Sequence, residues 1–189
     1  MGLGHGILMR MFGRPTGLLG RLGGTILARA NYRPAVWTIG LLNLRRDDAV
    51  LEIGFGPGVA IELLAASARY VAGVDPSPEM VGQATRRNAE AITAGRAELH
   101  KASAESMPFA DQMFDKALAI NSMQLWPDAA AGLREVRRVL RPGGRIALTF
   151  TTYSGRGRGG LRELLEGAGF ADQQFAETEK AFCLTAARN

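Results

Sequence analysis

The chain has 189 residues, of which 47% are hydrophobic and 22% are charged, a composition typical of one globular domain with room for a short appendage. No uninterrupted run of about 18 apolar residues occurs, and the first residues lack the basic-then-apolar order of a secretion signal. The single cysteine, Cys183, excludes an internal disulfide. These features predict a cytoplasmic protein without a membrane-spanning helix.

The net charge of +5 is distributed unevenly along the chain. Residues 1–46 contain seven arginines and no acidic residue, whereas the remainder holds 16 basic and 18 acidic residues. The positive excess therefore lies entirely in the first quarter. A localised basic segment favours an anionic partner, such as an acidic substrate, a phosphate-bearing molecule or a lipid surface, although a solvated helix face would have the same composition.

This basic segment, residues 1–46, differs in character from the rest and predicts a helical extension. Apolar residues recur at helical spacing over residues 17–33, although three glycines weaken that helix by about 1 kcal/mol each relative to alanine. A second helix is expected over residues 35–44, after Pro34. We therefore divide the chain into an N-terminal helical cap, residues 1–46, and a larger domain, residues 47–189.

From residue 47 onward, short β-like runs alternate with helical stretches, a pattern typical of a parallel sheet with crossover helices. The strands are expected over residues 49–53, 70–74, 97–102, 114–121, 145–152, 170–176 and 180–187, and the helices over residues 59–68, 78–92, 129–140 and 161–168. Ser77 and Asp128 are expected to cap helices, and Arg141–Gly144 to form a turn. The last connection is too short for a parallel crossover, so the final two strands are predicted to pair antiparallel.

The segment from Val50 to Gly58 reads Val-Leu-Glu-Ile-Gly-Phe-Gly-Pro-Gly and joins the first strand of the domain to its first helix. The glycines allow backbone angles that other residues avoid, and they let a ligand lie against the main chain. Dinucleotide-binding folds use a similar turn, but with a third glycine at the position of Val59. Because Pro57 also removes an N–H from the loop, the segment favours a cofactor without a pyrophosphate.

Asp75 ends the second predicted strand, 21 residues after Gly54. In a parallel sheet this position lies beside the glycine loop, at the carboxyl edge. A carboxylate there can accept hydrogen bonds from both hydroxyls of a ribose, as in other adenosine-binding folds. The alternative is a turn aspartate before Pro76 without a ligand.

Five segments follow one another at regular spacing. They are Val50–Gly58, Val71–Met80, Ala104–Phe109, Phe114-Asp115 leading to Asn121, and Glu135–Arg145. Together they resemble the class I S-adenosylmethionine-dependent methyltransferases, in particular the type 11 branch, over about residues 47–189. The resemblance implies an α/β, Rossmann-like doubly wound sheet with strand order 3-2-1-4-5-7-6 and strand 7 antiparallel. It also implies S-adenosylmethionine as cofactor and S-adenosylhomocysteine as product, and no metal.

The resemblance assigns cofactor-binding roles to residues that match the family's motifs. Those expected along the methionine part are Glu52, Gly54, Phe55 and Gly56, in the loop that Gly58 completes. Those expected at the ribose and adenine are Asp75, Pro76, Met80, Ala104 and Glu105, and Asn121 is expected at the sulfonium end. One departure is Ser103, where many relatives have an aspartate that bonds the adenine amino group; a serine accepts that bond more weakly.

The acceptor side is expected after the fourth strand, where Gln124 would orient a polar acceptor. Trp126 is a candidate pocket wall or, equally, a core residue. Tyr32 and Tyr153 are further candidates. A methyl on a sulfonium is already activated, so alignment supplies most of the catalysis and a general base is optional. Candidate bases are few.

His100 falls in a predicted strand and is interpreted as structural, as is Cys183. His5 lies in the glycine-rich N-terminus, from which a cap would bring it over the site.

The sequence therefore predicts a methyltransferase that acts on a small-molecule acceptor with an oxygen, nitrogen or sulfur nucleophile, apolar or anionic. The acceptor and the oligomeric state are left open. A phospholipid methyltransferase that contacts a membrane through its basic N-terminal helix is an alternative. A nucleic-acid partner is disfavoured, because Asn121 is not followed by the Pro-Pro-Tyr typical of base amino methylation. A nicotinamide-dependent oxidoreductase and a cofactor-binding module without catalysis are further alternatives.

Overall fold

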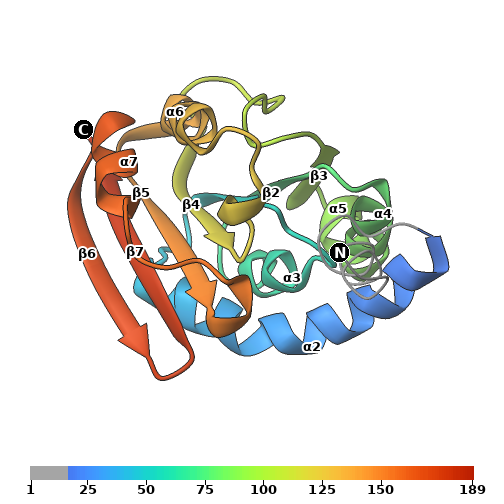
Figure 1. Ribbon diagram of the computed structural model, residues 1–189. Helices are drawn as coiled ribbons and strands as arrows, with labels where there is room; N and C mark the ends of the chain where they lie inside the picture. Colours follow the sequence, from blue (N-terminus) through green and yellow to red (C-terminus); the bar gives the residue numbers. More distant parts are fainter. Residues whose placement is uncertain (1–16) are drawn as a thin grey trace.

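The computed structural model describes residues 17–189, and the side chains of residues 29–189, as an α/β fold built on a seven-stranded sheet (Figure 1). Its strands are β1 (Ala49–Ile53), β2 (Tyr70–Asp75), β3 (Ala97–Lys101), β4 (Phe114–Ile120), β5 (Leu140–Thr151), β6 (Phe170–Thr178) and β7 (Ala181–Arg188). The order across the sheet is β3-β2-β1-β4-β5-β7-β6, with β7 antiparallel to both neighbours and every other pair parallel. The predicted strand order and antiparallel last strand are confirmed.

Helices cover both faces of this sheet (Figure 1). On one face lie α2 (Gly17–Leu41), α3 (Val59–Ala65), α4 (Pro78–Arg87) and α5 (Ala89–Thr93); on the other lie α6 (Ala129–Val139) and α7 (Leu161–Gly167). Two short 3-10 helices, η2 (Met123–Leu125) and η3 (Thr152–Ser154), follow β4 and β5. The predicted caps are confirmed, because the side chains of Ser77 and Asp128 accept hydrogen bonds from backbone N–H groups at the starts of α4 and α6.

The central strands are apolar because both of their faces are covered. All five residues of β1 are buried. Val50 packs into the core cluster beneath α2 and α3, whereas Leu51 and Ile53 pack into the cluster beneath α6 and α7. A strand buried on both sides reads as a continuous apolar run, which is why the sequence located β1 correctly.

Residues 17–41 form one helix, α2, so the prediction of two helices separated at Pro34 was wrong. A proline inside a helix removes a backbone hydrogen bond and costs about 3 kcal/mol. Packing of the second half of α2 offsets this cost. Leu42, just beyond the helix end, is 1% exposed, and the buried hydroxyls of Thr38 and of Thr149 in β5 lie 2.7 Å apart. These contacts keep the chain helical through the proline.

A second correction concerns the helix predicted over residues 78–92, which is divided at Asn88 into α4 and α5. The Asn88 side chain is buried, and its amide nitrogen donates to the carbonyl oxygens of Gly58 at 3.1 Å and Ala84 at 2.9 Å. The helix is therefore divided at the residue that bonds to the glycine loop. The sequence around Asn88 does not indicate this contact.

A third correction concerns Arg141–Gly144, predicted as a turn but found inside β5. Leu140 already pairs with Phe114 of β4, and after an irregularity in register the two strands pair again at Lys116 and Arg145. The stretch is therefore a bulge within a strand rather than a separate turn.

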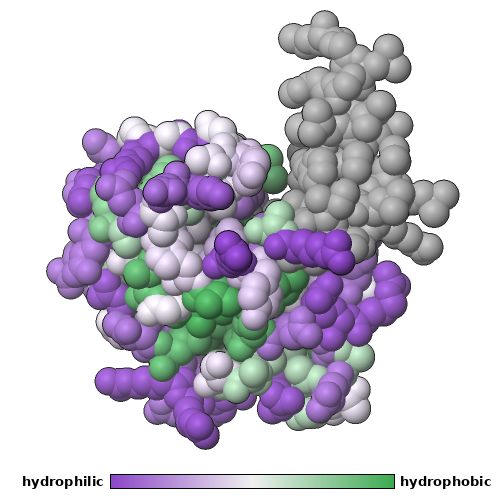
Figure 2. Space-filling model, turned by 90° about the horizontal axis from the view of Figure 1, so that it is seen from below, coloured by the Kyte–Doolittle hydropathy of each residue, from purple (hydrophilic) through white to green (hydrophobic). Residues whose placement is uncertain are grey.

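The position of α2 matters for function. The helix ends shortly before β1 begins, whereas its Thr38 reaches Thr149 near the carboxyl end of β5. Before Thr38 the helix lies across this face of the sheet and packs against α3 and α4, which follow the glycine loop and Asp75 in the chain (Figure 1). Figure 2 looks onto the side of the molecule that α2 covers, where apolar side chains gather among hydrophilic ones. Tyr32 and Val36 of α2 are exposed. Across residues 17–189, no helix is long and apolar enough to cross a membrane.

Candidate active site

The glycine loop lies between β1 and α3, with Gly54, Gly56 and Gly58 all in the left-handed backbone region at φ of 76°, 51° and 80°. A Cβ on Gly54 would stand 2.3 Å from the Cβ of Ser122, and one on Gly58 would stand 2.7 Å from the Cβ of Ala84. A Cβ on Gly56, by contrast, would enter open space. The first and third glycines are therefore required by their neighbours, whereas the second presents bare backbone to a ligand.

Asp75, at the end of β2, holds this loop. Its Oδ2 accepts a hydrogen bond from the backbone N–H of Gly56 and its Oδ1 accepts one from that of Ser77, both at 2.9 Å. Each carboxylate oxygen retains capacity for a further hydrogen bond. The loop and the carboxylate predicted from spacing are thus brought together, in an arrangement suited to the two hydroxyls of a ribose.

Glu52, on β1, is a second buried carboxylate at the same edge, 3% exposed. Burial raises the pKa of its carboxyl well above the usual range, the charge of Asp75 raises it further, and a hydrogen bond from the Ile61 backbone opposes the shift. The pKa of Asp75 is also raised, chiefly by burial. The Oε2 atom of Glu52 has no hydrogen-bond partner within the described part of the chain.

These observations test whether S-adenosylmethionine fits. An unpartnered buried carboxylate oxygen suits an ammonium group, the open face of Gly56 suits a ligand against the backbone, and Asp75 suits a diol. The residues present therefore fit the cofactor. Its methionine end would lie along Glu52 and the glycine loop, and its ribose at Asp75.

The side chains of Phe55 and Met80, both expected at the cofactor, serve mainly to pack the core. The Phe55 ring is 3% exposed and abuts Gly73, where an added Cβ would stand 2.6 Å from it, so the backbone of Phe55 is what the loop offers a ligand. Met80 is 2% exposed, whereas Pro76 is exposed. Pro76 is therefore the more accessible of the two residues predicted at the adenine.

The segment after β3 contains the remaining predicted adenine contacts. Ser103 is half-buried and forms a short bridge with Ser106, and Ala104 is buried. The carboxylate of Glu105 accepts a hydrogen bond from the backbone N–H of Asp128, which ties the segment to the start of α6. The segment is thus fixed beside the sheet edge.

The structure packs Trp126 against the core cluster beneath α6. An added Cβ on Gly132 would stand 2.6 Å from the indole ring, so only glycine allows this contact. Core packing is therefore one role of Trp126, and a pocket-wall role stays a prediction.

Asn121 and Gln124 follow β4. Asn121 has φ of 51°, and its Oδ1 accepts hydrogen bonds from the backbone N–H and the hydroxyl of Thr151. Because that oxygen is engaged, the amide nitrogen of Asn121 is the end suited to a ligand. The Nε2 of Gln124 donates to the backbone oxygen of Asn121 at 2.8 Å, whereas its buried Oε1 has no partner among the described residues.

A hollow of about 240 Å³ opens beside Gln124 and is lined by Met123, Gln124, Ala129 and Arg156. It lies where β4 and β5 end, the edge at which parallel α/β sheets bind their ligands. Arg156, in the loop after η3, was not predicted, because the glycines and arginines around it match no motif of the family. The two tyrosines proposed as acceptor contacts do not line this hollow, and Tyr153 is 90% exposed.

The interpretation of His100 and Cys183 as structural agrees with their surroundings. His100 lies in β3, bonds to Glu98 and meets the ring of Phe109 edge-on. Cys183 is buried in β7, and burial raises the pKa of its thiol to about 11. His5 lies outside the described residues.

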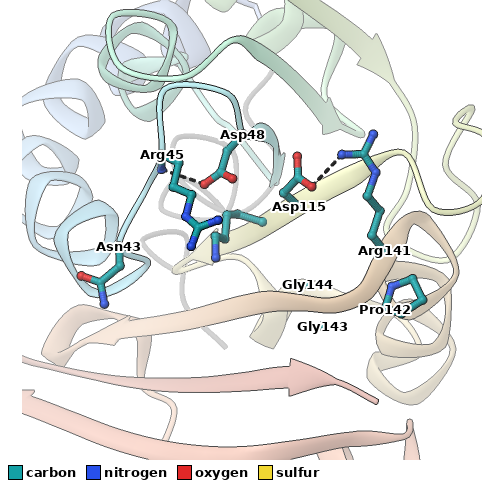
Figure 3. Close-up of a pocket in the computed structure, with 9 residues that line it drawn as sticks. Asn43, Arg45, Asp48, Asp115, Arg141, Pro142, Gly143 and Gly144 are labelled. Carbon is teal, nitrogen blue, oxygen red and sulfur yellow. Dashed lines mark hydrogen bonds and ion pairs between the residues drawn. The ribbon is translucent and has the colours of Figure 1, made fainter.

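A second hollow, of about 450 Å³, lies at the opposite edge, where β1, β4 and β5 begin (Figure 3). Its two carboxylates already have partners. Asp48 accepts from the backbone N–H of Arg45, and Asp115 accepts from Arg141 and from the backbone N–H of Ala49. These bonds fix the backbone where β1 and β5 begin. This edge of the sheet is opposite the edge that carries the glycine loop.

Comparison with known proteins agrees with this geometry. A family model described as a methyltransferase domain matches residues 51–148. The chain is 32% identical over 130 residues to the uncharacterized methyltransferase YdaC of Bacillus subtilis, which covers 68% of this chain and 70% of that protein. It is 38% identical over 110 residues to the 27-O-demethylrifamycin SV methyltransferase of Amycolatopsis mediterranei, but that match covers 58% of this chain and only 40% of the relative.

Among solved structures, a SAM-dependent methyltransferase from Aquifex aeolicus matches with a TM-score of 0.72 and 20% sequence identity, over 82% of this chain and 89% of that one. At this identity the likeness concerns the fold. The family model and the YdaC relative establish membership, and the loop, Asp75 and Glu52 fit the methyl donor. The chain belongs to the class I, type 11 S-adenosylmethionine-dependent methyltransferases, and it is an enzyme of that family with S-adenosylmethionine as its cofactor.

Proposed function

We propose that this enzyme methylates a small molecule bound in the hollow lined by Gln124 and Arg156. The observation that carries the proposal is the position of that hollow, at the ends of β4 and β5 on the same sheet edge as the glycine loop. Its volume of about 240 Å³ is below the roughly 300–1,000 Å³ of pockets for drug-sized ligands. A small acceptor, or the reacting end of a larger one, matches this size.

When bound, S-adenosylmethionine would supply an activated methyl on a sulfonium. The acceptor's oxygen, nitrogen or sulfur atom would take that methyl as the carbon–sulfur bond breaks, with the electron pair left on sulfur and the acceptor's proton passing to water. The residues of this chain contribute alignment. Asp75 and Glu52 fix the donor, and Gln124 fixes the acceptor atom. Alignment of this kind supplies much of the rate enhancement in such displacements.

The small-molecule proposal predicts two results for the full chain. Calorimetry should show binding of S-adenosylmethionine and S-adenosylhomocysteine but not NAD, since Pro57 leaves the loop one N–H short for a pyrophosphate. A panel of small phenols, amines and thiols should yield at least one methylated product by mass spectrometry. Binding of the cofactor without methylation of any panel member would contradict the small-acceptor proposal and favour a macromolecular or lipid acceptor, or a module without catalysis.

We further propose that the N-terminal segment, residues 1–46, acts as a cap for the acceptor side. The support is the position of α2, which packs against α3 and α4, the helices that follow the glycine loop and Asp75. Removing residues 1–33 leaves the anchor at Thr38 and Leu42 in place but takes away the leading turns of α2. Acceptor turnover should therefore fall at least about fivefold, while S-adenosylhomocysteine affinity stays within twofold. Unchanged turnover in the shortened, folded protein would contradict the cap.

The membrane-contact alternative gains no support from the relatives, and liposome co-sedimentation tests it directly.

A further inference from the structure

Arg156 is placed over the acceptor hollow by a loop that is tied to itself. The Ser154 hydroxyl donates to the Thr151 carbonyl at 2.8 Å and accepts a hydrogen bond from the Arg156 backbone N–H at 3.2 Å. The guanidinium donates to the Gly159 carbonyl at 3.3 Å, and the residue is half-buried. The side chain is thus held at the hollow rather than extended into solvent.

The charge of Arg156 is not balanced by an acid. No carboxylate among residues 29–189 lies within ion-pair distance of it, and residues 1–46 contain none to offer. The two arginines that follow are engaged. Arg158 pairs with Glu177 and lies over the rings of Phe175 and Phe182, and Arg162 lies over Phe175. Of these three arginines, Arg156 alone faces the hollow without an ionic or aromatic partner.

Gln124, which lines the same hollow, supplies a complementary group. Because its Nε2 donates to Asn121, its orientation is fixed and its Oε1 is left as a buried acceptor without a donor in the described part of the protein. A buried polar atom left unpaired costs about 1–3 kcal/mol, which a donor on a ligand would recover. The hollow therefore combines one hydrogen-bond acceptor and one cation.

We propose that the methyl acceptor is a small carboxylic acid that also carries a hydroxyl or amine nucleophile, with its carboxylate bound by Arg156. The nucleophile's O–H or N–H donates to Gln124 Oε1, which directs the lone pair of that atom toward the donor methyl. A planar guanidinium matches a carboxylate with two parallel hydrogen bonds, which lysine cannot reproduce. This inference rests on the proposed small-molecule methylation and names its substrate class.

The test uses matched pairs in which each acid has a neutral amide partner, such as hydroxybenzoates with hydroxybenzamides and amino acids with their amides. Binding is measured by calorimetry on the full chain saturated with S-adenosylhomocysteine, and turnover by mass spectrometry with S-adenosylmethionine. We expect acids to bind and react at least about tenfold better than their amides. Arg156→Gln should remove that preference, and Arg156→Lys should restore part of it.

Arg158→Gln is the matched control, because it changes the same loop by the same chemistry while its side chain points to Glu177 and the aromatic rings. It should keep the acid preference, and all three variants should bind S-adenosylhomocysteine like the native protein. Equal binding of acids and amides, or an equal loss for both in Arg156→Gln, would overturn the inference while leaving small-molecule methylation intact. Absence of any methylated product despite cofactor binding would instead overturn the proposed function and this inference with it.

Discussion

Replacement of Asp75 by asparagine is expected to weaken the binding of S-adenosylhomocysteine at least about 100-fold. The native carboxylate accepts from the backbone N–H groups of Gly56 and Ser77 and has capacity left for a ribose diol. Hydrogen bonds to a charged acceptor contribute about 1.5–3 kcal/mol each, so the loss of two corresponds to a factor of 100 or more. In addition, the new amide NH₂ would face one of the two backbone N–H groups and loosen the loop.

Calorimetry on the folded variant checks this expectation, with Asp47→Asn as control. Asp47 is exposed and precedes β1 at the opposite edge of the sheet, so its replacement changes the net charge equally without touching the loop. Affinity of Asp75→Asn within threefold of the native value would show that Asp75 only shapes the turn, the alternative left open by the sequence.

Replacement of Glu52 by glutamine is expected to change stability and binding in opposite directions. A buried carboxylate without a partner for Oε2 destabilises the ligand-free protein, so its neutral isostere should raise the free energy of unfolding by about 1–2 kcal/mol at pH 8. The same change removes the negative charge that would face the cofactor's ammonium group. Affinity for S-adenosylhomocysteine should therefore fall about 10- to 100-fold.

The pH dependence gives this prediction a distinctive signature. Because the folded-state pKa of Glu52 is raised, its stabilising contribution is fully present below the ordinary glutamate pKa and is lost as the pH rises through the raised value. The gain from Glu52→Gln should thus be largest above that value and vanish near pH 4. Urea unfolding at several pH values measures it, with the exposed Glu90→Gln of α5 as control. A pH-independent gain, or none, would show that Glu52 is not a strained buried acid.

Much of the fold was predictable because its strands are buried runs bounded by turn residues. β1 was placed with its observed bounds, and the sheet order followed from the family resemblance. The errors lie where distant contacts override local signals. Pro34 predicts a helix end, but Thr38 bonds to a strand 111 residues away, and the division at Asn88 accompanies a bond to Gly58. The sequences next to Pro34 and Asn88 do not indicate either contact.

The candidate site was predictable on the donor side and less so on the acceptor side. Asp75 and the glycine loop follow from spacing, because strand ends in a parallel sheet meet at one edge. Arg156 does not, because nothing in a glycine-arginine stretch reveals that a hydroxyl two residues earlier fixes its position. The unpartnered oxygen of Gln124 is likewise a property of packing, visible only once β4 and β5 are placed side by side.

The docking of α2 through its second half has a consequence for how this enzyme could diverge. Thr38 and Leu42 are anchored in the core, whereas Tyr32 and Val36 are exposed. Substitutions at these two exposed positions therefore carry little stability cost, while those at the anchor are constrained. The exposed positions of such a helix can therefore change during evolution while the anchor, the donor site and the core remain unchanged.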